Sequence, residues 1–84
     1  MQVKILYFAN VREIVGCAEE FFECADGLDV DRLFKMVVEK YAKLGEISED
    51  LALALNAEYL DGHGEGVALS DKDEVAIIPP VSGG

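Results

Sequence analysis

The stretch 29-DVDRLFKMVVEKYAKLG-45 decides the fold class because its apolar residues follow the period of an α-helix. They fall at positions 30, 33, 34, 37, 38, 41 and 44, which lie on one face of a helix. Asp29 is a suitable N-cap, and Gly45 is a suitable stop at the C-terminal end. The sequence therefore predicts one main amphipathic helix, with Phe34 and Tyr41 on the face that packs against a sheet.

The segments on both sides of this helix have the pattern of β-strands. Residues 2–8 and 19–25 each alternate in side-chain character, and the second segment follows within hairpin distance, which predicts an antiparallel pair. Residues 51–56 and 74–78 are apolar runs of strand length, and a short strand is expected within 57–60. Together these segments predict a sheet of four to five strands.

Two shorter segments connect the strands. Asn10 followed by Glu13 at cap spacing, with Gly16 after the apolar residues, predicts a helix of about one to two turns. The segment 61-DGHGEG-66 is rich in glycine and predicts a loop. We expect His63 to be exposed in this loop and predict no metal site, because glycine neighbours do not hold metal ligands in a fixed geometry.

The order of the elements is strand, short helix, strand, long helix, strand, short strand and strand, which predicts an α+β fold. The long helix is expected to cross one face of a mixed sheet whose first and last strands lie parallel at its centre. This arrangement resembles the ubiquitin-like β-grasp fold. Residues 1–78 are predicted to form the β-grasp domain, and residues 79–84 a flexible, extended C-terminal tail.

The charge balance restricts the possible partners. The chain has 84 residues, of which 17 are acidic and 7 are basic, and its net charge is −10. This charge opposes phosphate backbones and anionic lipid surfaces, so we expect neither nucleic acid nor a membrane as a partner. The acidic residues are spread along the chain, which fits either a solvated surface or a surface matched to a basic protein.

Membrane insertion and secretion are both disfavoured. No apolar run approaches the roughly 20 residues of a membrane span, and the N-terminus lacks the features of a signal peptide. We therefore expect an intracellular, cytoplasmic protein. The two cysteines, Cys17 and Cys24, are predicted to be reduced thiols because their spacing fits neither a zinc site nor a CxxC motif. Cys24 alternates with Phe22 and is assigned to the core.

The final residues, 77-IIPPVSGG-84, have an unusual composition. Pro79 and Pro80 lack a backbone N–H and hold φ near −65°, so the last strand is predicted to end at Ile78. The chain is expected to leave the sheet extended, with the two prolines stiffening the first part of the tail.

Beyond the prolines the side chains become small. Val81 and Ser82 offer a little side chain for a groove, and Gly83 and Gly84 present bare backbone that can enter a channel too narrow for a Cβ atom. The carboxylate of Gly84 is a poor electrophile, but ATP can convert it to an acyl-adenylate, from which a sulfur nucleophile displaces AMP. The product is a C-terminal thiocarboxylate. The alternative is a frayed terminus without a function.

Three stretches together resemble the family of small, sulfur-carrier subunits of molybdopterin synthase. They are 3-VKILYFANVREIVG-16, 53-LALNAEYL-60 and 73-DEVAIIPPVSGG-84, and the resemblance covers essentially the whole chain. The PPVSGG ending is specific, because sulfur carriers of thiazole synthesis typically end in GG without the two prolines and tRNA-thiolating carriers usually end in HGG. The loop 61–66 does not map onto the family pattern.

The resemblance implies a protein that is not an enzyme alone and that binds no cofactor. An adenylyltransferase and sulfurtransferase related to ubiquitin-activating enzymes uses ATP to adenylate Gly84, which then becomes a thiocarboxylate. The tail inserts into the large synthase subunit, within a heterotetramer, and donates sulfur to cyclic pyranopterin monophosphate. This forms the molybdopterin dithiolene of the molybdenum cofactor.

The resemblance also assigns residues. Ile78 matches an apolar position that packs on partners, and Phe8 and Arg12 are weaker candidates for the same interface. The tail positions that match the family are Pro79, Pro80, Val81, Ser82, Gly83 and Gly84.

Other functions remain open at this point. A ubiquitin-like protein modifier would join Gly84 to lysines of other proteins after the same adenylation. A sulfur carrier for tRNA thiolation or thiazole synthesis would deliver the sulfur elsewhere. A passive β-grasp binding module would make no use of Gly84.

Overall fold

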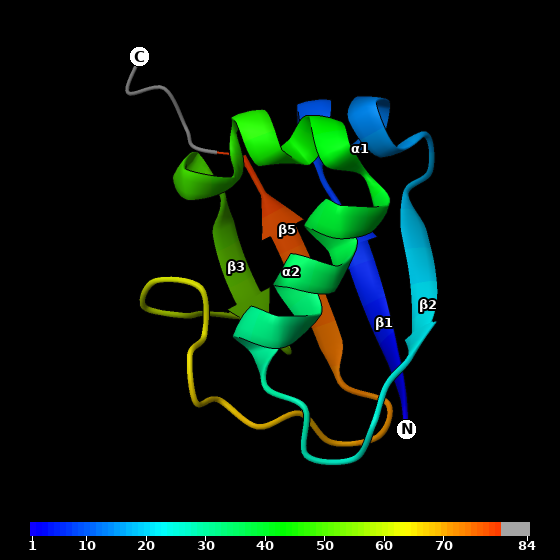
Figure 1. The fold of residues 1–84 in the computed structure, drawn as a ribbon, viewed down its shortest axis with the longest axis vertical. Helices are drawn as coiled ribbons and strands as arrows, with labels where there is room; N and C mark the ends of the chain where they lie inside the picture. The colour runs from blue at the N-terminus through cyan, green and yellow to red at the C-terminus, as the bar shows by residue number, and fades with distance from the viewer. Residues whose placement is uncertain (80–84) are drawn as a thin grey trace.

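The main helix lies across one face of a five-stranded mixed sheet, as Figure 1 shows. The computed structural model describes residues 1–79. The strands are β1 (Gln2–Tyr7), β2 (Glu19–Glu23), β3 (Ala52–Leu55), β4 (Glu58–Tyr59) and β5 (Glu74–Ile78). The helices are α1 (Ala9–Val15) and α2 (Val30–Lys40), and two short 3-10 turns follow α2, namely η1 (Ala42–Glu46) and η2 (Ser48–Asp50).

The first and last strands are parallel neighbours inside the sheet. The strand order is β2-β1-β5-β3-β4, with β1 parallel to β5 and antiparallel to β2. β3 is antiparallel to both β5 and β4. Ile77 of β5 lies opposite Tyr7 on one side and Leu53 on the other. The predicted α+β arrangement, with its parallel central pair, is confirmed.

The hydrophobic core lies between α2 and the sheet. Because strand side chains alternate between two faces, every second residue of β1 and β5 points at the helix. Cys24 is also buried, as predicted, and both cysteines are free thiols. The sheet residues of the core are Val3, Ile5, Tyr7, Leu53, Val75 and Ile77. The helix residues that meet them are Val30, Leu33, Phe34 and Val37.

The main helix begins as predicted but ends earlier. The carboxylate of Asp29 accepts a hydrogen bond from the Arg32 N–H at 2.9 Å, which is the expected N-cap. The α-helix ends at Lys40, so the prediction that Gly45 ends it was wrong. Beyond Tyr41 the chain tightens into η1, which still buries Leu44. The apolar pattern continues through the change of helix type, and this is why periodicity alone placed the end too late.

The short helix has a different N-terminus from the predicted one. Its N-cap is Phe8, and Asn10 lies inside α1 without capping it, so the prediction of an Asn10 cap was wrong. The chain turns between β1 and this helix at Ala9, which has a φ of 48°. The predicted stop at Gly16 is confirmed, with φ 93° and an N–H that donates to the Arg12 carbonyl.

The loop 61–66 is bound to the N-terminal end of α2. The second oxygen of the Asp29 carboxylate accepts from the Gly66 N–H at 3.2 Å, and the Val30 N–H donates to the Val67 carbonyl at 2.9 Å. Gly64 is buried against Val30. This glycine-rich segment is therefore part of the folded body. In the part of the chain that the structure describes, no helix is long and apolar enough to cross a membrane.

The buried contact of Gly64 gives a stability prediction with a matched control. Gly64 and Gly66 have φ values of 77° and 76°, but a Cβ at Gly64 would lie 2.6 Å from the Val30 Cβ, whereas a Cβ at Gly66 meets nothing within 4 Å. Gly66→Ala is expected to cost only the conformational penalty of about 1 kcal/mol. Gly64→Ala is expected to cost about 1–3 kcal/mol more, because it also overpacks the core.

Urea unfolding of both variants measures the two costs as changes in the free energy of unfolding. Equal destabilisation by the two substitutions would show that the short distance between Gly64 and Val30 does not restrict the side chain that fits at position 64.

Candidate functional site

The candidate site is the edge of the sheet at which β5 ends. Ile78 is the last residue of β5 and lies opposite Ala52 of β3, and Pro79 follows it half-buried. The strand ends where the sequence predicted, since Pro79 has no N–H to continue the ladder. The other predicted tail residues lie outside the described part of the chain: Pro80, Val81, Ser82, Gly83 and Gly84.

The structure brings Phe8 to the same edge. Because β1 and β5 are parallel, both strands finish at one side of the sheet. The Phe8 N–H donates to the Ile77 carbonyl at 3.3 Å, which fixes the backbone of Phe8 beside the end of β5. Phe8 is 40% exposed, while Ile78 is half-buried.

Arg12 lies close to this edge as well. It is an exposed residue of α1, and its Nε donates to the Tyr7 carbonyl at 3.4 Å. Since Tyr7 is the last residue of β1, the guanidinium is anchored next to Phe8. The three residues predicted for an interface, Ile78, Phe8 and Arg12, are therefore grouped by the structure at one end of the sheet.

An apolar row beside this edge was not predicted. Leu6 lies opposite Ala76, Ala76 opposite Ala54, and Ala54 opposite Tyr59, so the row crosses four strands. These side chains alternate with core residues and lie on the face away from α2, which we call the outer face. Tyr59 is 71% exposed. Alternation within each strand placed these residues on a face, but only the register of the sheet aligns them into a row.

A charged cluster holds the strands and the helix together behind Phe8. The Glu20 carboxylate on β2 accepts hydrogen bonds from the hydroxyl of Tyr7 at 2.8 Å and from the hydroxyl of Tyr41 at 2.8 Å. It also pairs with the ammonium of Lys40 at the end of α2. The Tyr7 and Tyr41 rings meet edge to face at 6.2 Å. The cluster thus links β1, β2 and the end of α2.

The contacts within the cluster shift the pKa values of Glu20 and of its partners, Tyr7 among them. Burial raises the pKa of the Glu20 carboxyl, but the hydrogen bonds from Lys40, Tyr7 and Tyr41 outweigh burial and hold this pKa below its usual range. Burial and the Glu20 carboxylate both raise the pKa of the Tyr7 phenol. Glu20 is thus ionised and Tyr7 is neutral at neutral pH. The strand sequence 19-EEFFE-23 by itself gives no sign of this cluster.

His63 is not the exposed loop residue that was predicted. Its Nε2 lies 3.2 Å from the Leu51 carbonyl, and its ring centroid lies 4.6 Å from that of Phe34. The side chain is half-buried because the loop folds onto α2 and places the imidazole on an aromatic surface. Among residues 1–79, no group of three or more His, Cys, Asp or Glu side chains could hold a metal ion.

Comparison with known proteins gives one family and consistent relatives. The ThiS family matches residues 5–84. The chain is 43% identical to the molybdopterin synthase sulfur carrier subunit of Chlamydomonas reinhardtii, over 100% of both chains.

Two solved structures have a similar fold. One is a chain in the complex of subunits 1 and 2 of the molybdopterin-converting factor from Helicobacter pylori, with a TM-score of 0.73, 26% identity and full coverage of both chains. The other is small archaeal modifier protein 1 from Methanosarcina acetivorans, with a TM-score of 0.80 and 28% identity over 99% of this chain and 96% of that one. These likenesses confirm the ubiquitin-like β-grasp fold.

The Glu20 cluster gives a pH-dependent stability prediction. Because the pKa of Glu20 is lower in the folded than in the unfolded chain, its contribution is present at neutral pH and is lost as pH falls through the folded value. Glu20→Gln is expected to destabilise the protein by about 1–3 kcal/mol at neutral pH, since the variant loses hydrogen bonds to a charged group. The difference from the wild type is expected to shrink as the solution is acidified.

Urea unfolding from neutral pH downward checks this, with Glu23→Gln as the control. Glu23 is an exposed residue of the same strand, and within the described residues its side chain makes no hydrogen bond. If the difference in the free energy of unfolding between the wild type and Glu20→Gln does not change with pH, the predicted role of the ionised carboxylate is contradicted.

Proposed function

The chain belongs to the ThiS family, and we propose that within this family it is the sulfur carrier subunit of a molybdopterin synthase. One observation supports this most strongly: the 43% identity with a sulfur carrier subunit extends over the full length of both chains. The family match reaches Gly84, so it includes the Pro-Pro and Gly-Gly residues of the ending. The proposed reacting group is the carboxylate of Gly84, with Gly83 beside it.

The proposed chemistry has two stages on this carboxylate. In the first, a carboxylate oxygen attacks ATP on a ubiquitin-activating-type enzyme, pyrophosphate leaves, and a glycyl adenylate forms. In the second, a sulfur nucleophile attacks the activated carbonyl and AMP leaves, which yields a thiocarboxylate. ATP is thus a substrate of the activating enzyme and is not held by this chain. Two such thiocarboxylates would each give one sulfur to cyclic pyranopterin monophosphate, and the two sulfurs would form the dithiolene.

The tail starts at Ile78 and Pro79, which we call the root of the tail, and the geometry there suits a tethered reagent. β5 is hydrogen-bonded on both sides, to β1 and to β3, so Ile78 and Pro79 start from a fixed place. A group on a short arm from a fixed root meets its target as an oriented, nearly unimolecular reactant once the body is docked. The proposed contribution of Pro79, Pro80, Val81 and Ser82 is to guide the tail into the partner.

The proposed docking surface is the outer face with the adjacent edge. Phe8, Ile78 and Tyr59 supply exposed or half-buried apolar groups, and Arg12 supplies a cation beside them. An apolar centre with a polar rim is the usual composition of a protein interface. The Helicobacter pylori structure is a complex of subunits 1 and 2, which supports a large subunit as the partner. We propose a heterotetramer of two small and two large subunits.

A second candidate function is protein modification. The TM-score is 0.80 with a small archaeal modifier protein and 0.73 with the subunit in the synthase complex, so the fold does not separate the two functions. Both use the same adenylate and differ in the attacking nucleophile, which is a sulfur species for the carrier and a lysine amine for the modifier.

Thiocarboxylate formation is the first test of the proposed function. The intact mass of the chain is measured after incubation with ATP, an activating enzyme of the ubiquitin-activating type and a sulfide source. The expected result is a mass gain equal to the replacement of one oxygen by sulfur. A chain that lacks Gly84 is the control and is expected to show no gain.

The two candidate functions give different outcomes in a cell extract. Covalent ladders that depend on Gly84, without any gain of sulfur, would favour the modifier. The absence of both a gain of sulfur and a covalent ladder, with an activating enzyme that is active on another carrier, would contradict both functions and leave a passive binding module.

The docking surface gives a prediction with a control of matched exposure. Phe8→Ala is expected to weaken binding to the large subunit by roughly tenfold, because truncation of a central apolar anchor typically costs more than about 1.4 kcal/mol. Met36 on α2 is 36% exposed, close to the 40% of Phe8, but lies on the helix away from the outer face. Met36→Ala is expected to leave the dissociation constant unchanged.

Calorimetric titration of the large subunit with each variant measures these constants. If both substitutions weaken binding equally, or if neither weakens it, Phe8 is not part of the proposed interface.

A further inference from the structure

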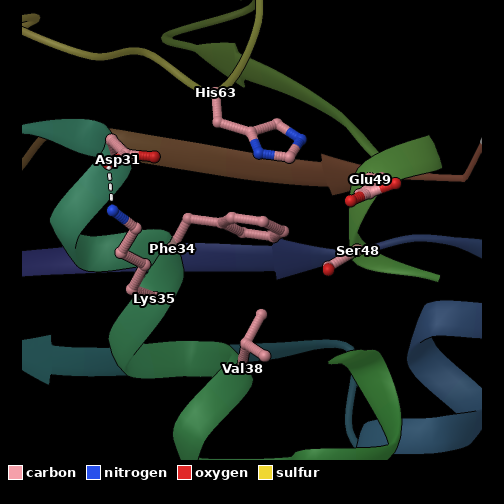
Figure 2. Close-up of a pocket in the computed structure, with 7 residues that line it drawn as sticks. All are labelled: Asp31, Phe34, Lys35, Val38, Ser48, Glu49 and His63. Carbon is pink, nitrogen blue, oxygen red and sulfur yellow. Dashed lines mark ion pairs between the residues drawn. The ribbon is translucent and has the colours of Figure 1, made fainter. Parts of the chain in front are cut away.

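A small pocket lies on the helix side of the molecule, away from the outer face. It has a volume of about 220 Å³ and lies between α2, η2 and the loop 61–66, as Figure 2 shows. Drug-sized ligands and cofactors occupy pockets of roughly 300–1,000 Å³, so this one is suited to a single long side chain. The proposed sulfur chemistry does not use it.

The inner surface of the pocket is apolar and aromatic. Phe34 and Val38 of α2 line it, and the His63 imidazole lies over the Phe34 ring with the planes tilted by 55°. Phe34 is only 4% exposed beneath the imidazole, so the half-buried His63 ring supplies the π face that is open to a planar group. A planar cation gains from such a face by stacking and by cation–π attraction.

The tautomer of a neutral His63 ring follows from its hydrogen bond to Leu51. The Leu51 carbonyl can only accept, so Nε2 carries the proton and donates to it at 3.2 Å. In the neutral ring Nδ1 then has a lone pair and is an acceptor. The hydroxyl of Ser48, also in the pocket, donates to the Gly45 carbonyl at 3.3 Å.

Among the charged groups at the rim of the pocket, one carboxylate has no ion-pair partner within the described residues. The Lys35 ammonium pairs with the Asp31 carboxylate at 3.0 Å, and Lys35 is otherwise well exposed. Glu49 of η2 lines the pocket too, and within residues 1–79 it forms no ion pair. With Lys35 already paired, the groups of the pocket that remain for a ligand are mainly acceptors: Nδ1 of His63 and the carboxylate of Glu49.

We propose that this pocket binds the side chain of an arginine that a protein partner presents. A guanidinium is planar, donates from five N–H groups and accepts none, so it matches a stacking surface that is bordered by acceptors. A lysine ammonium is a point charge that does not stack, and an anion would be repelled by Glu49. The pocket, of about 220 Å³, has room for one long side chain, which favours an arginine within a polypeptide.

The test is an NMR titration of the full isotope-labelled chain with arginine blocked at both ends as an N-acetyl amide. The expected result is a saturable shift of the His63, Phe34 and Ser48 signals. The lysine analogue is expected to bind at least about threefold more weakly, and the citrulline analogue, which has a similar shape without the charge, is expected not to saturate.

Variants locate the effect within the pocket. Glu49→Gln is expected to weaken binding of blocked arginine about threefold, and His63→Phe, which keeps a ring but removes the acceptor, is expected to weaken it as well. Glu46→Gln, an exposed acid of η1 outside the pocket, is the matched control and is expected to have no effect. Thermal unfolding of each variant shows that it is folded before it is titrated.

Three outcomes would overturn the proposal. An equal response to the lysine and arginine analogues, or equal weakening by Glu46→Gln and Glu49→Gln, would reduce the binding to general attraction of a cation by an acidic protein. Saturable shifts on the outer face alone would place the site elsewhere. Tighter binding of free arginine than of the blocked analogue would show that the pocket takes the amino acid and not a side chain of a protein.

Discussion

The parallel pairing of β1 with β5 is the constraint on which the other features depend. It joins residues 4–7 to residues 74–77, so nearly the whole chain must be arranged before the sheet has a centre. Two parallel strands cannot be joined by a tight turn, and the chain between them supplies α2, which buries the core face of both. The same pairing brings the ends of β1 and β5 to one edge, and this places Phe8 beside Ile78.

Because β5 lies inside the sheet, the root of the tail is held in a fixed position. An edge strand frays easily, because half of its backbone groups lack a protein partner. β5 has neighbours on both sides, and Val75 and Ile77 are buried beneath α2. On the other flank of β1, the ionised Glu20 connects β2 to Tyr7 and to the end of α2. Displacement of Ile78 would therefore require the core to open.

The sequence predicted what local patterns determine and missed what tertiary contacts decide. Alternation and apolar runs placed the strands of a sheet predicted to have four to five of them, and helical periodicity placed the main helix. The side-chain chemistry of Asp29 and the backbone freedom of Gly16 placed two helix ends. The end of α2 was misplaced because the apolar pattern does not distinguish an α-helix from the tighter η1. His63 was misplaced because its burial depends on how the loop folds onto Phe34, which glycine-rich sequence does not encode locally.

The two faces of the molecule are suited to different partners or to different parts of one partner. The outer face offers an apolar row and one cation at the root of the tail, whereas the helix side offers acceptors and a carboxylate around two rings. Two consecutive residues connect the two faces. The Leu51 carbonyl accepts the hydrogen bond from His63, and Ala52 lies opposite Ile78. A protein bound at the end of the sheet would therefore contact residues that are only a few positions along the chain from those of the pocket. Recognition by shape on one face and by charge on the other would let a small acidic domain present the same tail to partners of different composition.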